Sequence, residues 1–160
     1  LLGSQGVTTV VDVRTIPRSR HNPQFNKDTL PGALASAGLE YRHEPGLGGL
    51  RRPLPSSPNT AWRNASFRGF ADYMQSDEFS RALDGVAQLA ARGVPALMCA
   101  ESLPWRCHRS LIADALTVRG VRVKHILGLG KSQPHRLTPF IAVTGNRLSY
   151  PPEENQETPG

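Results

Sequence analysis

Residues 98–109, MCAESLPWRCHR, place several reactive side chains directly behind a short apolar stretch. Cys99 carries a thiol, which is nucleophilic as its thiolate, and Glu101 carries a carboxylate that can act as a general acid or base. A carboxylate that follows a buried strand is partly desolvated, which suits it to proton transfer near neutral pH. His108 can support that transfer and Arg109 can hold an anion. The stretch therefore predicts a chemical site with Glu101 as its acid–base group.

The role of Cys99 is open between two interpretations. Cys99 and Arg106 look like the cysteine–loop–arginine of rhodaneses and tyrosine phosphatases, in which loop N–H groups and a helix N-terminus wrap an oxyanion. Six residues separate the two here, one more than that motif allows, and they include Glu101 and Pro104. Cys99 is therefore either a nucleophile or a buried packing residue.

A metal site is the second interpretation of the same stretch. Cys99, Cys107 and His108 have the right chemistry for zinc, with His43 or His125 as a fourth ligand. The paired Cys-x-x-Cys spacing of a zinc knuckle is absent, however. We therefore expect no metal and no cofactor, and two reduced, unbridged thiols.

Arginines and a second carboxylate gather in the stretch DVRTIPRSRHNPQF, residues 12–25. Loops punctuated by proline keep arginines in a defined geometry, as phosphate recognition requires. We expect an anion to be held by Arg14, Arg18, Arg20 and Arg109. Asp12 can pair with Glu101 as the two carboxylates of glycosidic or N-glycosidic bond cleavage. Alternatively, each carboxylate pairs with an arginine and only holds the loop.

Strands and helices alternate along the chain, which predicts the elements that position these residues. Apolar strands are expected over residues 7–13, 39–43, 94–100 and 121–127. Helices are expected over residues 29–38, 77–92 and 109–120, with a shorter helical segment from Ser66. This alternation predicts an α/β fold, a mostly parallel sheet with helices on both faces. Residues 139–151 predict a small C-terminal hairpin that turns at Gly145–Asn146.

Ionisable residues follow each expected strand, and ligands of parallel sheets bind beyond the carboxyl ends of the strands. Asp12 and Arg14 follow the first strand, Cys99 and Glu101 follow the third, and His125 lies within the fourth. We expect these ends to face one crevice. The residues expected to line the substrate are His43, Gly48, Gly49, Tyr73 and His125.

Length and charge bound the class of protein. With 160 residues, we expect a single α/β domain over residues 1–150 and a disordered acidic tail over residues 151–160. The net charge is +6, and 16 of the 19 basic residues are arginine, which suits an anionic partner. Two cysteines indicate a reduced, cytoplasmic setting, and no apolar run is long enough to predict a membrane span.

Six blocks of the sequence resemble, in order and spacing, the uncharacterised family called domain of unknown function 488. The blocks are DVRTIPRSRHNPQF (12–25), YRHEPGLGGLR (41–51), FADYM (70–74), LMCAESLPWRCHRSLIA (97–113), VKHI (123–126) and LTPFIAVTGNRLSYP (137–151). Members of that family typically begin with a strand reading Thr-Ile-Gly-His-Ser and a helix. The resemblance therefore implies that an N-terminal strand and helix are missing from this sequence.

These observations favour an anion-binding α/β domain with a crevice at the strand ends. We expect a hydrolase or transferase that acts on a nucleotide-like or nucleic-acid substrate, with Asp12 and His108 supporting Glu101. The alternative is a non-catalytic module that binds nucleic acid or regulates another protein through the same basic face. In both cases the partner is a phosphate-bearing or other anionic ligand, and no membrane is involved.

Overall fold

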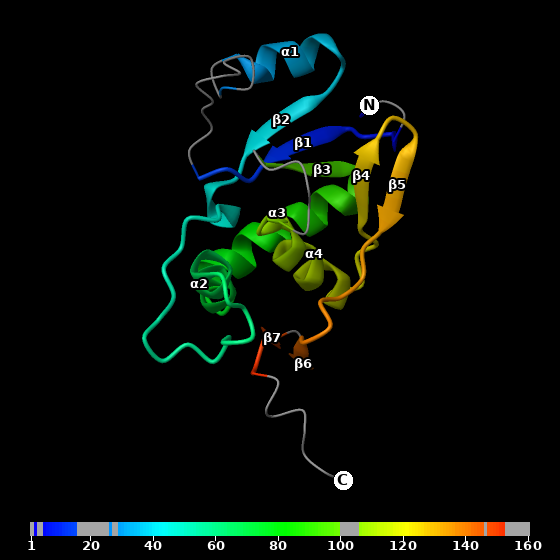
Figure 1. Cartoon of the computed structure of the whole chain (residues 1–160). Helices are drawn as coiled ribbons and strands as arrows, with labels where there is room; N and C mark the ends of the chain where they lie inside the picture. Colours follow the sequence, from blue (N-terminus) through cyan, green and yellow to red (C-terminus); the bar gives the residue numbers. More distant parts are fainter. Residues whose placement is uncertain are drawn as a thin grey trace.

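The centre of the protein is a three-stranded parallel sheet with the order β2-β1-β3 (Figure 1). The computed structural model describes residues 2, 5–15, 26, 29–99, 106–145 and 147–152. The strands are β1 (Thr9–Asp12), β2 (Glu40–His43) and β3 (Pro95–Met98). The central strand, with the sequence TVVD, is buried along its whole length, as β-branched residues in a parallel sheet should be. In the register, Asp12 lies beside His43 of β2 and Met98 of β3, so the three carboxyl ends are aligned.

Helices cover both faces of this sheet, as predicted. The helical elements are α1 (Leu30–Ser36), the 3₁₀ turn η3 (Pro45–Leu47), α2 (Ala65–Tyr73), α3 (Asp77–Arg92) and α4 (Arg109–Val118). The chain steps from β1 to β2 through α1 and then crosses to the other side of β1 through α2 and α3. Right-handed crossovers in opposite directions place their helices on opposite faces. Accordingly, α1 lies on one side of the sheet, and α3 and α4 lie on the other (Figure 1).

The apolar core lies between the sheet and the helices α2, α3 and α4. Helix α3 begins at the cap Ser76, whose hydroxyl accepts a hydrogen bond from Phe79 N, and it carries acidic residues in its first turn. Its buried residues recur at helical spacing, and they are Phe79, Ala82, Leu83, Val86 and Leu89. They pack with Val11 of β1, with Val13 directly after that strand, and with two residues of α4, Leu111 and Ile112. The helix predicted over residues 77–92 is confirmed.

The prediction of a fourth strand in the sheet is wrong. Residues 121–123 are not in a strand, and β4 (Lys124–Gly128) pairs antiparallel with β5 (Lys131–Pro134) in a separate two-stranded sheet. The chain turns back at Gly130, whose φ of +68° favours glycine, so β4 finds its partner within a few residues. Consequently three strand ends rather than four meet at the carboxyl edge in the part of the chain that the structure describes.

The C-terminal hairpin is confirmed, with β6 (Ala142–Thr144) paired to β7 (Arg147–Ser149). Gly145 in the turn has a φ of +63°. Tyr150, directly after β7, is fully buried and belongs to the core. Among the described helices, none combines the length and the apolar character that crossing a membrane requires.

Candidate functional site

The carboxyl end of β1 is organised around the buried side chain of Asp12. Arg14 donates to both carboxylate oxygens of Asp12, from Nε at 2.8 Å and from Nη2 at 2.6 Å, and Tyr41 OH donates at 2.6 Å. Burial alone raises the pKa of Asp12, but the hydrogen bonds from Arg14 and Tyr41 outweigh it and the net pKa is lowered. Asp12 is therefore an ionised, fully engaged carboxylate. Its contacts support the interpretation in which it pairs with an arginine.

His43 completes this end of the sheet. Its Nε2 lies 2.8 Å from the backbone carbonyl oxygen of Arg14, and since a carbonyl can only accept, Nε2 is the donor. This bond joins the end of β2 to the residues that follow β1. We define Asp12, Arg14, Tyr41 and His43 as the β1-end cluster.

His108 lies directly before α4 and is buried between two segments of backbone. Its Nε2 is 2.9 Å from the carbonyl oxygen of Leu47 and 3.2 Å from that of Val13. Both partners only accept, so we assign the ring proton to Nε2, which leaves a lone pair on Nδ1 of the neutral ring. Nδ1 lies 3.5 Å from Cys107 Sγ. Because Val13 stands between Asp12 and Arg14, His108 connects the start of α4 to the β1-end cluster.

The two glycines predicted to line the substrate instead pack closely against protein. A Cβ added to Gly48 would collide with Thr15. A Cβ added to Gly49 would lie 2.6 Å from His108 Nδ1 and 2.9 and 3.0 Å from the two neighbouring ring carbons. These nearly equal distances place it over the face of the ring rather than along the Nδ1 lone pair. Glycine at 49 thus lets the backbone support the imidazole while its Nδ1 edge stays available to Cys107.

The two thiols meet at the start of α4. Cys99 Sγ and Cys107 Sγ are 3.1 Å apart and are not joined by a disulfide, as expected. Arg109 donates to Cys107 Sγ from its backbone N and from Nε, each at 3.4 Å. The hydrogen bond with Cys99 is the largest cause that lowers the pKa of Cys107, to about 6, against the opposing effect of burial. We define Cys99, Cys107 and His108 as the Cys–Cys–His cluster.

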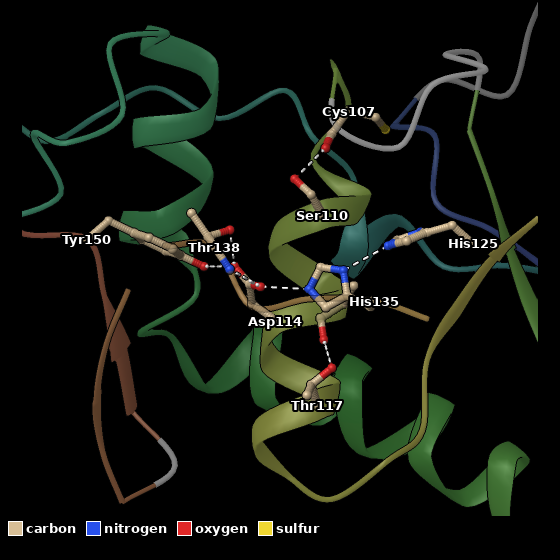
Figure 2. A network of polar contacts seen from close by, with 9 residues as sticks. Cys107, Ser110, Asp114, Thr117, His125, His135, Thr138 and Tyr150 are labelled. Carbon is tan, nitrogen blue, oxygen red and sulfur yellow. Dashed lines mark hydrogen bonds and ion pairs between the residues drawn. The ribbon is translucent and has the colours of Figure 1, made fainter. Parts of the chain in front are cut away.

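A second polar network runs from α4 to the β4–β5 hairpin (Figure 2). His125 Nε2 lies 2.7 Å from His135 Nδ1, and His135 Nε2 lies 2.7 Å from Asp114 Oδ1. Asp114 is fully buried and also accepts hydrogen bonds from Thr138 and from Tyr150 OH on its other side. Burial and the nearby charges of His135 and Arg109 lower the pKa of His125.

A cavity of about 720 Å³ lies between α3, α4, β3 and β4. Arg109 and His125 line it, whereas Asp12, Arg14, His43 and His108 do not. Its described lining is apolar apart from Gln5 and a few basic side chains, and it includes no carboxylate. The basic side chains are Arg109, Arg122, Lys124 and His125. Arg109 thus contacts both the Cys–Cys–His cluster and this cavity.

The structure brings together part of the predicted site. Asp12, Arg14 and His43 contact one another, and Cys99, His108 and Arg109 meet around Cys107. The His125 ring bonds to His135 instead, and it shares the lining of the cavity with Arg109. Tyr73 holds the loop after β2 instead, since its hydroxyl donates to the Gly46 carbonyl at 2.7 Å. Three predicted residues, Glu101, Arg18 and Arg20, lie outside the described residues.

Two functional residues, Asp114 and His135, received no role from the sequence, and Cys107 was considered only as a zinc ligand. Cys107 could have been recognised as the central thiol, because a cysteine just before a helix lies near unsatisfied N–H groups. Asp114 stands among apolar residues of an expected helix, and a carboxylate on a buried face requires partners. His135 lies in a polar stretch and carried no signal.

The comparison with known proteins identifies a family but no function. No curated protein and no solved structure matches the chain. The model of a family described as "Domain of unknown function DUF488" matches residues 1–116, which are 116 of the 160 residues. The matched range includes β1, the β1-end cluster, the Cys–Cys–His cluster and most of α4. The chain belongs to the DUF488 family.

Proposed function

We propose that the start of α4 and the adjoining cavity bind a phosphate-bearing ligand, and that the domain is a hydrolase or transferase acting on a nucleotide-like or nucleic-acid substrate. The observation that carries this proposal is the position of Arg109. Its backbone N–H and its Nε donate to Cys107 Sγ, and its side chain lines a cavity whose described charged residues are all basic.

The cavity suits a ligand with a negatively charged end and an apolar or planar body. Arg109, Lys124 and Arg122 supply positive charge, while the walls from α3 and β3 are apolar. In a partly enclosed site such charges attract an anion more strongly than they would in open water. Arg14 contributes less, because its Nε and Nη2 are engaged by Asp12. Arg18 and Arg20 remain proposed anion-binding residues.

The proposed chemistry assigns proton transfer to Glu101, which follows β3 in the sequence. His108 supports it by position, since its Nε2 contacts with Leu47 and Val13 hold the start of α4 against the strand ends. Asp12 acts through position rather than proton transfer, since four hydrogen bonds already occupy its carboxylate. Cys99 is a nucleophile or a packing residue in this scheme.

A second candidate function is a non-catalytic nucleic-acid-binding or regulatory module. The charge of residues 1–150 favours it, because the 3 Glu of the last ten residues leave 19 basic against 10 acidic residues, or +9.

Binding as a function of salt separates the two functions. The probes are fluorescent adenosine diphosphate and a fluorescent single-stranded oligonucleotide, tested with wild type, Arg109→Gln and the exposed control Arg92→Gln. The proposal predicts nucleotide binding that weakens about tenfold or more in Arg109→Gln alone, with a shallow salt dependence. Oligonucleotide binding with a steep logarithmic salt slope, and equal in both variants, would instead establish the non-catalytic module.

Glu101→Gln tests the enzyme itself once a nucleotide substrate is found. The change keeps the size of the side chain but removes its acidic proton, so turnover should fall about 10²–10⁴-fold with ligand affinity little changed. The exposed Glu78→Gln is the matched control. Loss of folding stability and of binding together would show that Glu101 only anchors an arginine.

A further inference from the structure

We propose that the Cys–Cys–His cluster binds a zinc ion. One ligand atom from each of Cys99, Cys107 and His108 lies within 4.8 Å of the other two. Two sulfur atoms and an imidazole nitrogen are the ligand set that zinc prefers over harder cations such as magnesium or calcium. Two thiolates and a neutral imidazole would also neutralise the charge of the ion in this largely buried position.

Two of the three distances between the ligand atoms can be compared with those of a tetrahedral zinc site, and the third, between Cys99 and His108, lies within 4.8 Å. Zinc lies about 2.3 Å from sulfur and about 2.0–2.1 Å from nitrogen, so tetrahedral ligands stand about 3.8 Å apart for two sulfurs and about 3.6 Å apart for sulfur and nitrogen. Cys107 Sγ and His108 Nδ1 are already 3.5 Å apart. The two sulfurs, at 3.1 Å, must separate by about 0.7 Å, which a small rotation about the side-chain bonds provides.

The imidazole is oriented as a zinc ligand requires. Histidines that bind zinc usually donate their other ring N–H to a carbonyl or carboxylate, which fixes the tautomer and the ring orientation. His108 Nε2 makes this kind of contact with Leu47 and Val13. Gly49 supports the face of the same ring without covering the Nδ1 edge. The fold thus prepares Nδ1 as a ligand atom.

This inference departs from the expectation drawn from spacing. A single C-x7-CH element lacks paired cysteines close in sequence, but the fold brings the end of β3 against the start of α4 and so supplies the pair. With zinc bound, Cys99 is a zinc ligand, and this role takes the place of the two interpretations of Cys99 as a nucleophile or as a packing residue. The inference does not depend on the proposed substrate, because zinc binding can be measured without it.

The test measures zinc in the 160-residue chain, purified under reducing conditions without chelator and supplied with zinc alone. We expect about one zinc ion per chain by elemental analysis, and protection of both thiols from alkylation until a chelator is added. Cobalt substituted for zinc should show the charge-transfer absorption of sulfur ligands. Cys99→Ser, Cys107→Ser and His108→Gln should each weaken zinc binding by at least about 100-fold, because even changes outside the ligand set cost about 10–100-fold.

His43→Gln and His125→Gln are the matched controls, since neither ring belongs to the cluster, and both should keep wild-type affinity. Far-UV circular dichroism and urea unfolding verify that each variant is folded. If a variant fails to fold, the protection of the wild-type thiols by zinc still shows whether the cluster binds the ion. Reduced wild-type protein that takes up no zinc and whose thiols alkylate equally with and without zinc would overturn the proposal. Wild-type affinity in folded His108→Gln would overturn it as well.

Discussion

Replacing Asp114 by alanine should destabilise the protein by about 3–5 kcal/mol, because the side chain is a buried hub between α4 and the C-terminal segments. Its carboxylate accepts four hydrogen bonds, one from His135, two from Thr138 and one from the hydroxyl of the fully buried Tyr150. Each bond to a charged group contributes about 1.5–3 kcal/mol alone. The destabilisation stays below the sum of the four contributions, because the hydroxyls freed by the substitution can turn toward other partners.

Asp114→Asn should destabilise the protein less than Asp114→Ala, by about 1–3 kcal/mol. An asparagine oxygen can still accept from His135 and Thr138 N, and its amide can donate to the hydroxyls of Thr138 and Tyr150, which rotate to accept. The assay is urea unfolding at neutral pH, followed by far-UV circular dichroism, with unchanged m values as the sign of an unchanged transition.

The matched control is Asp84→Ala. Asp84 is 57% exposed and pairs with Arg119 at the surface, and such pairs contribute about 0–1 kcal/mol. If the free energy of unfolding of Asp114→Ala lies within about 1 kcal/mol of that of wild type, or equals that of Asp84→Ala, Asp114 is not a buried hub.

Three other predictions concern the two clusters and the His125–His135 pair. The lowered pKa of Asp12 predicts a contribution to stability that is fully present above its unfolded pKa of 3.8 and is lost as pH falls through the lower folded pKa. Urea unfolding at acid pH should therefore show a larger loss of stability in wild type than in Asp12→Asn. Gly49→Ala should weaken zinc binding about 10–100-fold, because the added methyl group displaces the His108 ring. Gly32→Ala is the control and should leave zinc binding unchanged, because a Cβ at that position meets nothing within 4 Å. Equal zinc affinities in the two variants would contradict the packing of Gly49 against His108. The pKa of His125, followed by NMR, should lie below its ordinary 6.5 because of burial and the charges of His135 and Arg109, and a value above 6.5 would contradict the network.

The sequence predicted the fold where one residue pattern dominates. The β-branched TVVD run of β1 can only be a buried strand, and the regular apolar spacing from Phe79 to Leu89 can only be the inner face of a helix. The β4–β5 pairing was missed because β5 reads KSQP, which is fully exposed and has no apolar alternation. Its pairing depends on the tight turn at Gly130 rather than on burial.

The sequence predicted which residues belong to the candidate site better than it predicted the role of each residue. The alignment of parallel strand ends placed Asp12 and His43 together, because register makes this unavoidable. The return of Arg14 onto Asp12 and the proton position on His108 depend on side-chain and carbonyl directions, which residue types do not reveal. The contact between His135 and Asp114 joins residues 21 positions apart and depends on where the β4–β5 hairpin folds back.

A crystal structure of the protein soaked with adenosine diphosphate tests the central claim, that the start of α4 is the anion-binding centre of the domain. We predict density for the phosphates within hydrogen-bond distance of the Arg109 side chain, with the rest of the ligand in the cavity between α4 and β4. Soaked crystals of Arg109→Gln should lack this density. Phosphate density away from α4, or unchanged in Arg109→Gln, would contradict the claim.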